Sequence, residues 1–345
     1  MTPTIHQIIM SRSPKRPDLE TIYYEGAKIP LCHLEQPPAK PVQKMLGLLA
    51  TWPDLPLRRP LERQLRSNPL DACYDHDIPC SSTATQAAAF TISLEEELST
   101  GFRAGQAAQV WRVSTASLNK PLVARLYDPL YFNTIIIDRF AAIERALGVY
   151  DETYKHFQSL VGSHVPILHG IFAAEITVNF IKPRHIYCVL SDYVPGIDMQ
   201  CLLDEHDPKR SKTCPAHNAA FVDCTARLAY DFFICDIIPM DMLPRNLIID
   251  IPTTPSSENF CDAQGCPWRN RIHIDLDFPS TQPEHPYALK ATMIDIGLVR
   301  FMKRFPAMED IKFCRQWVLG QWNVPWIGPE TRDLLGRWVS PANAS

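Results

Sequence analysis

Three side chains in this sequence have types and spacing that could carry chemistry. Asp241 is followed five residues later by Asn246, and the chain then runs directly into the apolar segment Leu247–Ile249. Asp295 stands in Met293–Leu298, an apolar segment that ends in Asp-x-Gly. A carboxylate can accept a proton from an attacking hydroxyl, while an amide and a second carboxylate can hold Mg²⁺ on phosphates. This order of groups is typical of a phosphoryl-transfer site, although Asp and Asn also occupy ordinary turns.

The elements that must position these residues are predicted from hydrophobic periodicity. Apolar runs and alternation predict strands over residues 90–94, 108–113, 122–127, 165–172 and 186–192. Apolar residues at helical spacing predict a helix over 138–160, with Gly148 as a point where it could break. From residue 198 the pattern turns helical, notably over 218–234, before the chain reaches Asp241. A strand-like core over 271–278 and Trp-rich helices over 311–339 follow.

Residues 1–90 differ in composition from the rest of the chain. Twelve of the 31 prolines precede residue 80, and proline at this density breaks helices and removes backbone donors from strands. We therefore expect a largely disordered arm, within which Val42–Trp52 has the pattern of a short amphipathic helix docking on the body. The Pro/Ser/Asn-rich residues 251–289 are expected to form an insertion.

Composition and charge limit the classes of protein that fit. Hydrophobic residues make up 46% and charged residues 21%, which is ordinary for a globular protein. A net charge of −4 gives no reason to expect nucleic-acid binding. No apolar run is long enough to cross a bilayer, and the N-terminus lacks the basic start and apolar core of a signal peptide. We expect a cytoplasmic or nuclear protein with no membrane partner, whose eleven cysteines are mostly buried thiols rather than disulfides.

Some of the cysteines lie near histidines. Cys261 and Cys266 stand in a polar segment with four residues between them, and His273 follows. Cys214 and His217 lie further upstream. A zinc clip needs four correctly spaced ligands, and this second pair is not at zinc-finger spacing. The sequence alone therefore does not predict a zinc site.

Five short motifs, in this order, resemble those of the protein-kinase-like superfamily. They are Leu122–Pro129, Asp151–Tyr154 with Val165-Pro166 after it, Ser191–Gly196, Asp241–Asn246 and Ile294–Gly297. The chain is most similar to the divergent fungal kinase-like proteins that stand between eukaryotic protein kinases and the aminoglycoside/choline phosphotransferases. The resemblance covers about residues 95–340.

The resemblance implies an α+β fold with two lobes. The N-lobe and hinge would span residues 91–197, with an antiparallel sheet and one helix, and the larger helical C-lobe would span 198–345 around the insertion. The implied cofactors are ATP and Mg²⁺. Asp241 would be the catalytic carboxylate, while Asn246 and Asp295 would ligate Mg²⁺. The glycine-rich loop, the third strand and the hinge would supply the remaining nucleotide contacts: Gly101, Gly105, Val110, Arg125, Asp192 and Val194.

Two departures from the family pattern affect the phosphate side of the site. The family's third strand carries a Lys that holds the α- and β-phosphates, whereas this sequence has Arg125, whose planar fork does not replace a compact ammonium. Arg125 could pair with Asp151 or Glu152 of the long helix, and Lys120 is a nearby cation that could take over. The loop that begins at Gly101 has Ala at the third glycine position, which gives a poorer phosphate cradle.

Two classes of function therefore stay open. The first is an ATP- and Mg²⁺-dependent phosphotransferase acting on a hydroxyl of an unknown small-molecule or protein acceptor, because both metal ligands and the catalytic Asp are present. The second is a pseudokinase, a nucleotide- or protein-binding scaffold without turnover, which the two departures favour. Residues 198–220 and 250–290, where acceptor pockets of this superfamily arise, carry no readable motif. The acceptor, the role of the N-terminal arm and the oligomeric state are not predicted.

Overall fold

The computed structural model describes residues 22–34, 69–74, 78, 90–99, 101, 108–132, 139–156, 158–178, 182–203, 213–274, 288–296, 299–301, 311–322 and 331. The chain divides into two compact units. The first comprises Met1–Val42, Thr51–Glu152 and Ile167–Tyr193, and the second comprises Gln43–Ala50, Thr153–Pro166 and Val194–Ser345. Each unit has its own sheet structure and its own buried core.

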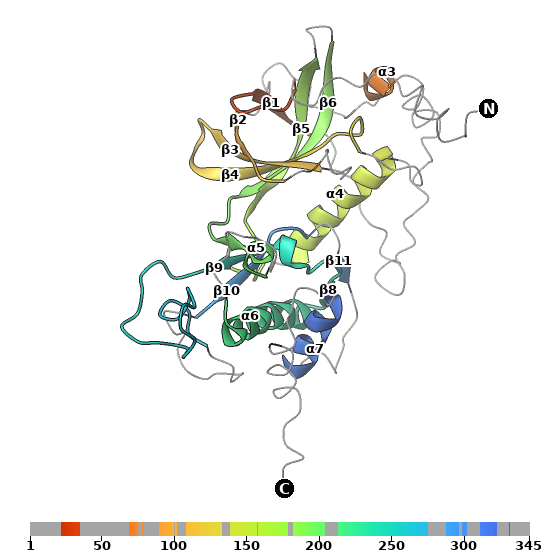
Figure 1. The fold of residues 1–345 in the computed structure, drawn as a ribbon. Coiled ribbons are helices and arrows are strands. Elements are labelled where there is room, and N and C mark those ends of the chain that lie inside the picture. Colours follow the sequence, from red (N-terminus) through yellow and green to blue (C-terminus); the bar gives the residue numbers. More distant parts are fainter. Residues whose placement is uncertain are drawn as a thin grey trace, which may run out of the picture. The chain divides into compact units, whose positions relative to one another are not determined.

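A six-stranded antiparallel barrel forms the centre of the first unit (Figure 1). In the order in which they hydrogen-bond, its strands are β1 (Lys28–His33), β2 (Phe90–Glu97), β3 (Ala108–Thr115), β4 (Leu118–Tyr127), β6 (Lys182–Asp192) and β5 (Leu168–Val178). β1 closes the barrel, since Ile29 pairs with Ile92 of β2 and Cys32 pairs with Ala173 of β5. Closure leaves the sheet without an unpaired edge.

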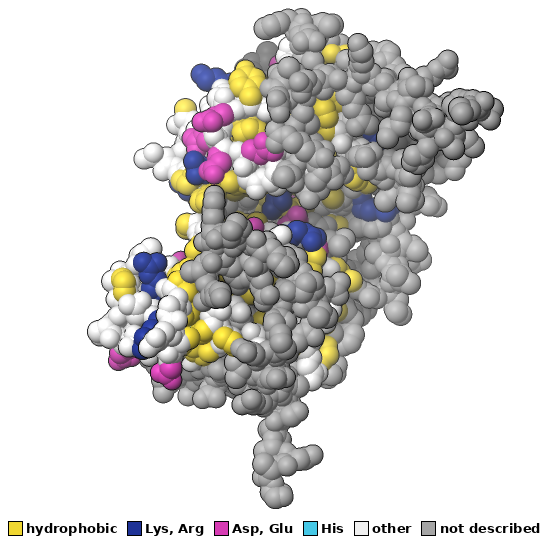
Figure 2. Space-filling model, in the orientation of Figure 1, with side chains coloured by type: hydrophobic (Ala, Val, Ile, Leu, Met, Phe, Trp, Pro, Cys, Tyr) yellow, Lys and Arg dark blue, Asp and Glu magenta, His cyan; other side chains and the backbone are white. Residues whose placement is uncertain are grey.

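Alternation of buried and half-exposed side chains explains why these segments form strands. Along β3, Gln109, Trp111 and Val113 are buried, while Val110 and Arg112 on the opposite face are only half-buried. This period of two is that of a pleated strand with one face on a core. On the outer face, charged side chains of β2 and β3 pair with each other, as in the 2.7 Å contact of Arg112 Nη1 with Glu96 Oε2. Figure 2 shows such acidic and basic side chains together on the surface of this unit.

A buried ion pair lies next to the barrel core. The Arg184 guanidinium donates to both oxygens of Asp128, at 2.9 and 2.5 Å, and both side chains are fully buried. Tyr23 Oη donates to Asp128 at 2.7 Å, and the backbone N–H of Leu130 donates at 3.0 Å. Burial, followed by the charge of Asp128, raises the pKa of Tyr23 well above its usual value. The carboxylate is therefore satisfied by donors from three separate segments of the unit.

Helices of the chain include α3 (Pro69–Tyr74) and the longer α4 (Arg139–His156). Phe140, Ile143, Leu147 and Tyr150 are buried along α4, and their spacing of three or four residues forms one apolar face. α4 was predicted over 138–160, and it runs through Gly148 without a break. Among the residues that the structure describes, no helix is both long enough and apolar enough to cross a bilayer.

Two small antiparallel sheets and several helices make up the described part of the second unit. β9 (Leu247–Asp250) lies between β7 (Ile197–Asp198) and β10 (Lys290–Met293), and β8 (Ile237–Pro239) pairs with β11 (Val299–Phe301). The helical elements are α5 (Met199–Leu203), α6 (Pro215–Ile234), α7 (Ile311–Gln321) and the 3₁₀ turn η4 (Pro244–Asn246).

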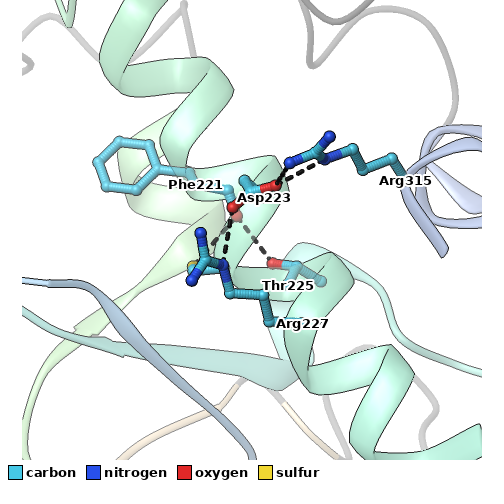
Figure 3. A network of polar contacts seen from close by, with 6 residues as sticks. Phe221, Asp223, Thr225, Arg227 and Arg315 are labelled. Carbon is cyan, nitrogen blue, oxygen red and sulfur yellow. Dashed lines mark hydrogen bonds and ion pairs between the residues drawn. The ribbon is translucent and has the colours of Figure 1, made fainter. Parts of the chain in front are cut away.

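α6 and α7 lie side by side in this unit (Figure 1) and are joined by an ion-pair network (Figure 3). Arg315 of α7 donates to Asp223 of α6 at 2.6 Å, and Arg227 donates to the other oxygen of Asp223 at 2.9 Å. Phe233 of α6 also packs edge-on against Trp317 of α7, with ring centroids 5.2 Å apart. The two helices are therefore joined by both an ion-pair network and an aromatic contact.

The architecture agrees in part with the sequence-based predictions. The α+β composition is confirmed, and strands or helices occur at all the predicted positions between residues 90 and 234. The sheet, however, is a closed barrel of six strands. Two segments of the expected disordered arm, β1 and α3, are folded, while Val42–Trp52 lies outside the described residues. No disulfide joins the described cysteines.

Candidate functional site

Asp241 and Asn246 lie on the short connection between β8 and β9. Asp241 lies two residues after the end of β8, and Asn246 ends the 3₁₀ turn η4. The side-chain Nδ2 of Asn246 donates to the backbone carbonyl of Asp241 at 2.9 Å, and its backbone N–H donates to the Leu243 carbonyl at 2.8 Å. Asn246 is 8% exposed. These two bonds fix the shape of the connection and place the Asn246 side chain against the backbone of Asp241.

The β9–β10 ladder brings Asp295 to the same place. β9 begins just after Asn246, and β10 ends two residues before Asp295. Because the strands are antiparallel, with Leu247 opposite Met293, the start of β9 and the end of β10 meet. The backbone N–H of Ile294 continues the ladder by donating to the Asn246 carbonyl at 2.9 Å. Asp295, which is half-buried, therefore directly follows Ile294, the residue that contacts Asn246.

The end of β10 is also anchored to α6. The N–H of Met293 donates to the His164 carbonyl at 2.9 Å, and the ring of His164 contacts Asp231 of α6 at 2.9 Å. Ile296, just beyond Asp295, is 1% exposed. Asp295 thus lies between Ile294, whose N–H is hydrogen-bonded, and Ile296, which is buried. This limits the positions available to the Asp295 carboxylate.

Asp241 is held by a neighbouring cation. Arg245 Nη2 donates to the two carboxylate oxygens of Asp241 at 2.8 and 2.9 Å. The Arg245 side chain is 50% exposed and that of Asp241 is 28% exposed, so solvent screens the pair and its net contribution to stability is small. A pocket of about 290 Å³ opens at this loop. It is lined by Met240, Asp241, Leu243, Pro244, Arg245, Gln321 and Trp322.

Trp322 supports this loop from the end of α7, a role that the sequence analysis did not assign. Its indole Nε1–H donates to the Met242 carbonyl at 2.8 Å, and the side chain is 1% exposed. The Trp-rich composition of residues 311–339 was noted, but nothing in the sequence indicated which of these residues would contact the connection between β8 and β9.

Of the two glycines in the predicted glycine-rich loop, the structure describes Gly101, whereas Gly105 lies outside the described residues. Gly101 has a φ of +33°, and a Cβ there would collide with the side-chain oxygen of Gln109 and the carbonyl of Ala108. Gln109 is fully buried and donates to Glu97 Oε1 at 2.6 Å and to the Ser99 carbonyl at 3.0 Å. Glycine is therefore required by this packing, whether or not the loop binds phosphate.

Val110 and Arg125 lie opposite each other in the barrel. Val110 on β3 pairs with Arg125 on β4, which pairs in turn with Val189 on β6. Arg125 is 8% exposed, so it is not the surface strand residue that was its alternative interpretation. Asp151 and Glu152 both stand on α4 with half-buried side chains. Which of the two pairs with Arg125 stays a prediction.

The predicted hinge begins at the end of β6. Asp192 accepts hydrogen bonds from Lys120 Nζ and from His169 Nε2, both at 2.6 Å. Burial raises the pKa of Asp192, but the bonds and charges of Lys120 and His169 outweigh that effect, so the net pKa is lowered. The N–H of Asp192 donates to the Ile167 carbonyl at 2.9 Å, so adenine would have to compete for it. Lys120, the cation that could take over from Arg125, therefore pairs with Asp192 of the predicted hinge.

The residues predicted to act on the nucleotide fall into two groups. Asp241, Asn246 and Asp295 belong to the second unit, which brings them together. Val194 also belongs to the second unit by its place in the chain. The described residues Gly101, Val110, Arg125 and Asp192 belong to the first unit. The catalytic and ligand roles of all of these residues stay a prediction.

Neither a protein-family model nor a curated protein matches this sequence. Solved structures to which the chain is similar include the kinase PK-1 of Cydia pomonella granulovirus, at 13% identity over 61% of this chain and 55% of that one, with a TM-score of 0.35. A second is the CAK complex of Chaetomium thermophilum bound to ATP-γ-S, at 14% identity over 62% and 49%, with a TM-score of 0.35.

A third is the PknI kinase domain of Mycobacterium tuberculosis, at 13% identity over 60% of this chain and 58% of that one, with a TM-score of 0.30. The chain therefore spans about half the length of the solved structures that it matches. Protein kinases are among the structures that this chain resembles, at low sequence identity.

Proposed function

We propose that this chain is a kinase-like phosphotransferase that uses ATP and Mg²⁺. The observation that carries the proposal is the meeting of Asp241, Asn246 and Asp295 at one end of the β9–β10 ladder. The bond from Asn246 to the Asp241 carbonyl closes a short loop, but it does not require Asp295, which comes from a segment about 50 residues further along the sequence. Two carboxylates and an amide thus come together. They are the groups that phosphoryl transfer requires.

The donor set at this end of the ladder fits Mg²⁺, which prefers oxygen ligands. The amide of Asn246 is oriented by its own hydrogen bond: Nδ2 donates to the Asp241 carbonyl, so Oδ1 is the atom left to face a cation. Asp295 supplies a carboxylate from the facing strand. Bound Mg²⁺ would neutralise charge on the phosphates of the nucleotide.

Asp241 is proposed to act on the acceptor. Its carboxylate would accept the proton of the acceptor hydroxyl as the hydroxyl oxygen attacks the γ-phosphorus and ADP leaves. Arg245 must release the Asp241 oxygens for this step, and its half-exposed side chain has room to turn towards solvent. A guanidinium next to the reacting carboxylate would then be available to hold phosphate oxygens.

We extend the proposal to a two-lobe arrangement, with an N-lobe and hinge over 91–197 and a C-lobe over 198–345. The chain passes from the first compact unit to the second between Tyr193 and Val194, which supports a hinge at 192–194. The acceptor is a hydroxyl compound, a small molecule or a protein.

The proposal is tested by measuring the thermal midpoint with and without Mg²⁺ and ATP. A ligand that binds only the folded state at a hundred times its Kd adds about 2.7 kcal/mol of stability. We expect a Mg²⁺-dependent rise in the parent and its loss in Asp295→Ala, since that variant removes a metal ligand. Asp250→Ala is the matched control, because Asp250 is an exposed carboxylate at the opposite end of the same ladder. An equal rise in Asp295→Ala and Asp250→Ala would exclude Asp295 as a ligand.

Turnover is measured separately, as phosphoryl transfer to acceptors or to water. Asp241→Asn should abolish turnover and keep the rise in midpoint with Mg²⁺ and ATP, because the amide cannot accept the proton but leaves the metal ligands in place. Residual activity equal to that of the parent would exclude Asp241 as the catalytic base.

A pseudokinase is the second candidate function, and a specific contact favours it. Arg245 occupies both oxygens of Asp241, and the phosphate-binding Lys of active kinases is replaced by Arg125. A pseudokinase would show the rise in midpoint without turnover, in the parent and equally in Arg245→Ala. Turnover in either protein would decide for the enzyme.

A further inference from the structure

Four side chains gather at the N-terminus of α6, away from the residues of the proposed nucleotide site. Cys214 and His217 come from the start of the helix, and Cys261 and Cys266 come from the segment after β9. The three sulfur atoms and a ring nitrogen of His217 all lie within 4.8 Å of one another. His217 is fully buried, Cys214 and Cys266 are 7% and 8% exposed, and Cys261 is half-buried.

The spacing of these atoms is close to that of a tetrahedral zinc centre. Zinc–sulfur bonds of about 2.3 Å at the tetrahedral angle place two sulfurs about 3.8 Å apart. Here Nδ1 of His217 lies 3.1 Å from Cys214 Sγ and 3.4 Å from Cys266 Sγ. Only a small outward movement of the four side chains is needed to accommodate the ion.

The tautomer of His217 suits a metal ligand. Its Nε2 lies 3.1 Å from the Ile272 carbonyl, and since a carbonyl only accepts, Nε2 carries the proton. Nδ1 therefore presents its lone pair towards the sulfurs of Cys214 and Cys266. A backbone carbonyl that holds the second nitrogen of a ligating histidine is the usual outer contact of a zinc site.

The local backbone also favours the cluster. Cys214 precedes α6 in extended conformation, makes no side-chain capping bond to the helix, and is followed by Pro215. Its sulfur therefore lies at the N-terminal end of a 20-residue helix. Gly265, with a φ of +79°, turns the chain between Cys261 and Cys266. The N–H of Cys266 donates to the Ala263 carbonyl at 3.3 Å and closes that turn.

The segment that supplies two of the ligands has little other means of folding. Within residues 251–274 no helix or strand forms, and its buried apolar side chains are Cys266 and Ile272. Two backbone bonds of 2.6 Å fold the segment back on itself, from Ser256 to Asn270 and from Phe260 to Arg269. Trp268 Nε1 reaches Thr213 Oγ1 at 3.3 Å. A metal ion at the cluster would contribute folding free energy that a core of this size does not.

We propose that Cys214, His217, Cys261 and Cys266 bind one zinc ion, which joins the insertion to the start of α6. Three thiolates and an imidazole complete a tetrahedral shell and leave no position for substrate, so the site is structural rather than catalytic. The two halves of the motif, Cys-x₂-His and Cys-x₄-Cys, are separated by 43 residues between His217 and Cys261. The inference does not depend on nucleotide binding.

The first test is the metal content of the full chain, purified without chelator or metal-affinity resin. We expect about one zinc per chain, and we expect Cys261→Ser and Cys266→Ser to lose zinc to a competing chelator at much lower concentrations than the parent. Cys201→Ser is the matched control, because Cys201 is an exposed thiol on α5 of the same unit. A zinc content that Cys266→Ser leaves unchanged would overturn the proposal.

The second test guards against variants that fail to fold. His217→Cys keeps four ligands, so it should retain zinc. Reconstitution with Co²⁺ should give the visible bands of tetrahedral coordination in both proteins, with stronger thiolate charge transfer in the variant. Folded parent that takes up neither Zn²⁺ nor Co²⁺, or unreduced protein in which mass spectrometry finds a disulfide between two of the three cysteines, would show that the cluster is not a metal site.

The third test addresses the role of the ion. Chelation of the parent should accelerate proteolysis within residues 251–274. The response to Mg²⁺ and ATP is measured in a separate experiment. Unchanged cleavage of that segment after the zinc has been removed would exclude the structural role.

Discussion

At the scale of single residues, this chain contains charged groups in two very different settings. Asp241 and Arg245 form a pair that solvent reaches, whereas Asp128 and Arg184 are fully buried. Water screens the first pair, so its partners can separate during a reaction at little cost. The second pair has given up its hydration and cannot lose one partner without leaving an uncompensated charge. The exposed pair is therefore suited to chemistry and the buried one to structure.

Removing one half of the buried pair should be strongly destabilising. Arg184→Met leaves the Asp128 carboxylate without its guanidinium, and we expect a loss of about 3–5 kcal/mol in the free energy of unfolding, measured by urea denaturation. Arg112→Met is the control, because Arg112 pairs with Glu96 at the surface and should cost about 0–1 kcal/mol. Equal losses in the two variants would contradict the structural role of the buried pair.

Asp192 predicts a dependence of stability on pH. Its pKa is lowered in the folded protein, below the unfolded value of about 3.9. A lowered carboxyl pKa contributes stability that is present above the unfolded pKa and is lost as pH falls through the folded pKa. The parent should therefore be more stable than Asp192→Asn near neutral pH, and the difference should disappear in acid below about pH 4.

The measurement is the thermal midpoint of both proteins across that range. Lys120→Met should reproduce part of the loss, since it removes one of the two side chains that donate to Asp192. A difference between parent and Asp192→Asn that persisted unchanged to the most acid pH would show that packing rather than charge was responsible.

At the scale of elements, the candidate site depends on contacts that join distant segments. The strand at 247–250 could be predicted as an apolar run, but β10 begins three residues before the apolar segment Met293–Leu298 that the sequence indicated. The pairing and register of the two strands could not be predicted. Register decides that Asn246 faces Ile294, and a slip of one residue would reverse the face on which each side chain lies. The support from Trp322 was equally hidden, because a helix sequence does not reveal which loop its last turn will contact.

Trp322→Phe should test that support. The substitution keeps an aromatic ring but removes the donor to the buried Met242 carbonyl, and an unsatisfied buried group costs about 1–3 kcal/mol. We expect a loss of that size in the free energy of unfolding and faster amide exchange over residues 240–246. Trp317→Phe, which keeps a ring against Phe233, should leave exchange in that loop unchanged. Equal exchange rates in both variants would contradict the supporting role.

At the scale of the whole molecule, sequence reasoning predicted the strands between residues 90 and 192 and the strand that follows Asn246, but not β7, β8 or β11. It did not predict β1, because Pro30 within that strand argues against one. The strand accommodates Pro30 because Pro30 is paired with Thr91 of β2, whereas the pairing of β1 with β5 begins only at Leu31. The missing N–H of Pro30 is therefore not needed for the ladder with β5. The four residues of the Cys/His cluster were considered as zinc ligands, but a zinc site was not predicted because the Cys214–His217 pair is not at zinc-finger spacing. Only the fold brings its two distant halves together.

The closing strand of the barrel has a consequence for how the chain tolerates shortening. β1 is separated from β2 by more than 50 residues, so a chain cut to begin at residue 90 would keep five consecutive strands and lose the sixth. The outer backbone groups of β2 and β5 would then be left without partners, and Ile92 and Leu94 would lose the cover of Ile29 and Leu31. Such open strands pair readily with those of another molecule. β1 thus covers two strand edges that would otherwise be open to pairing between molecules.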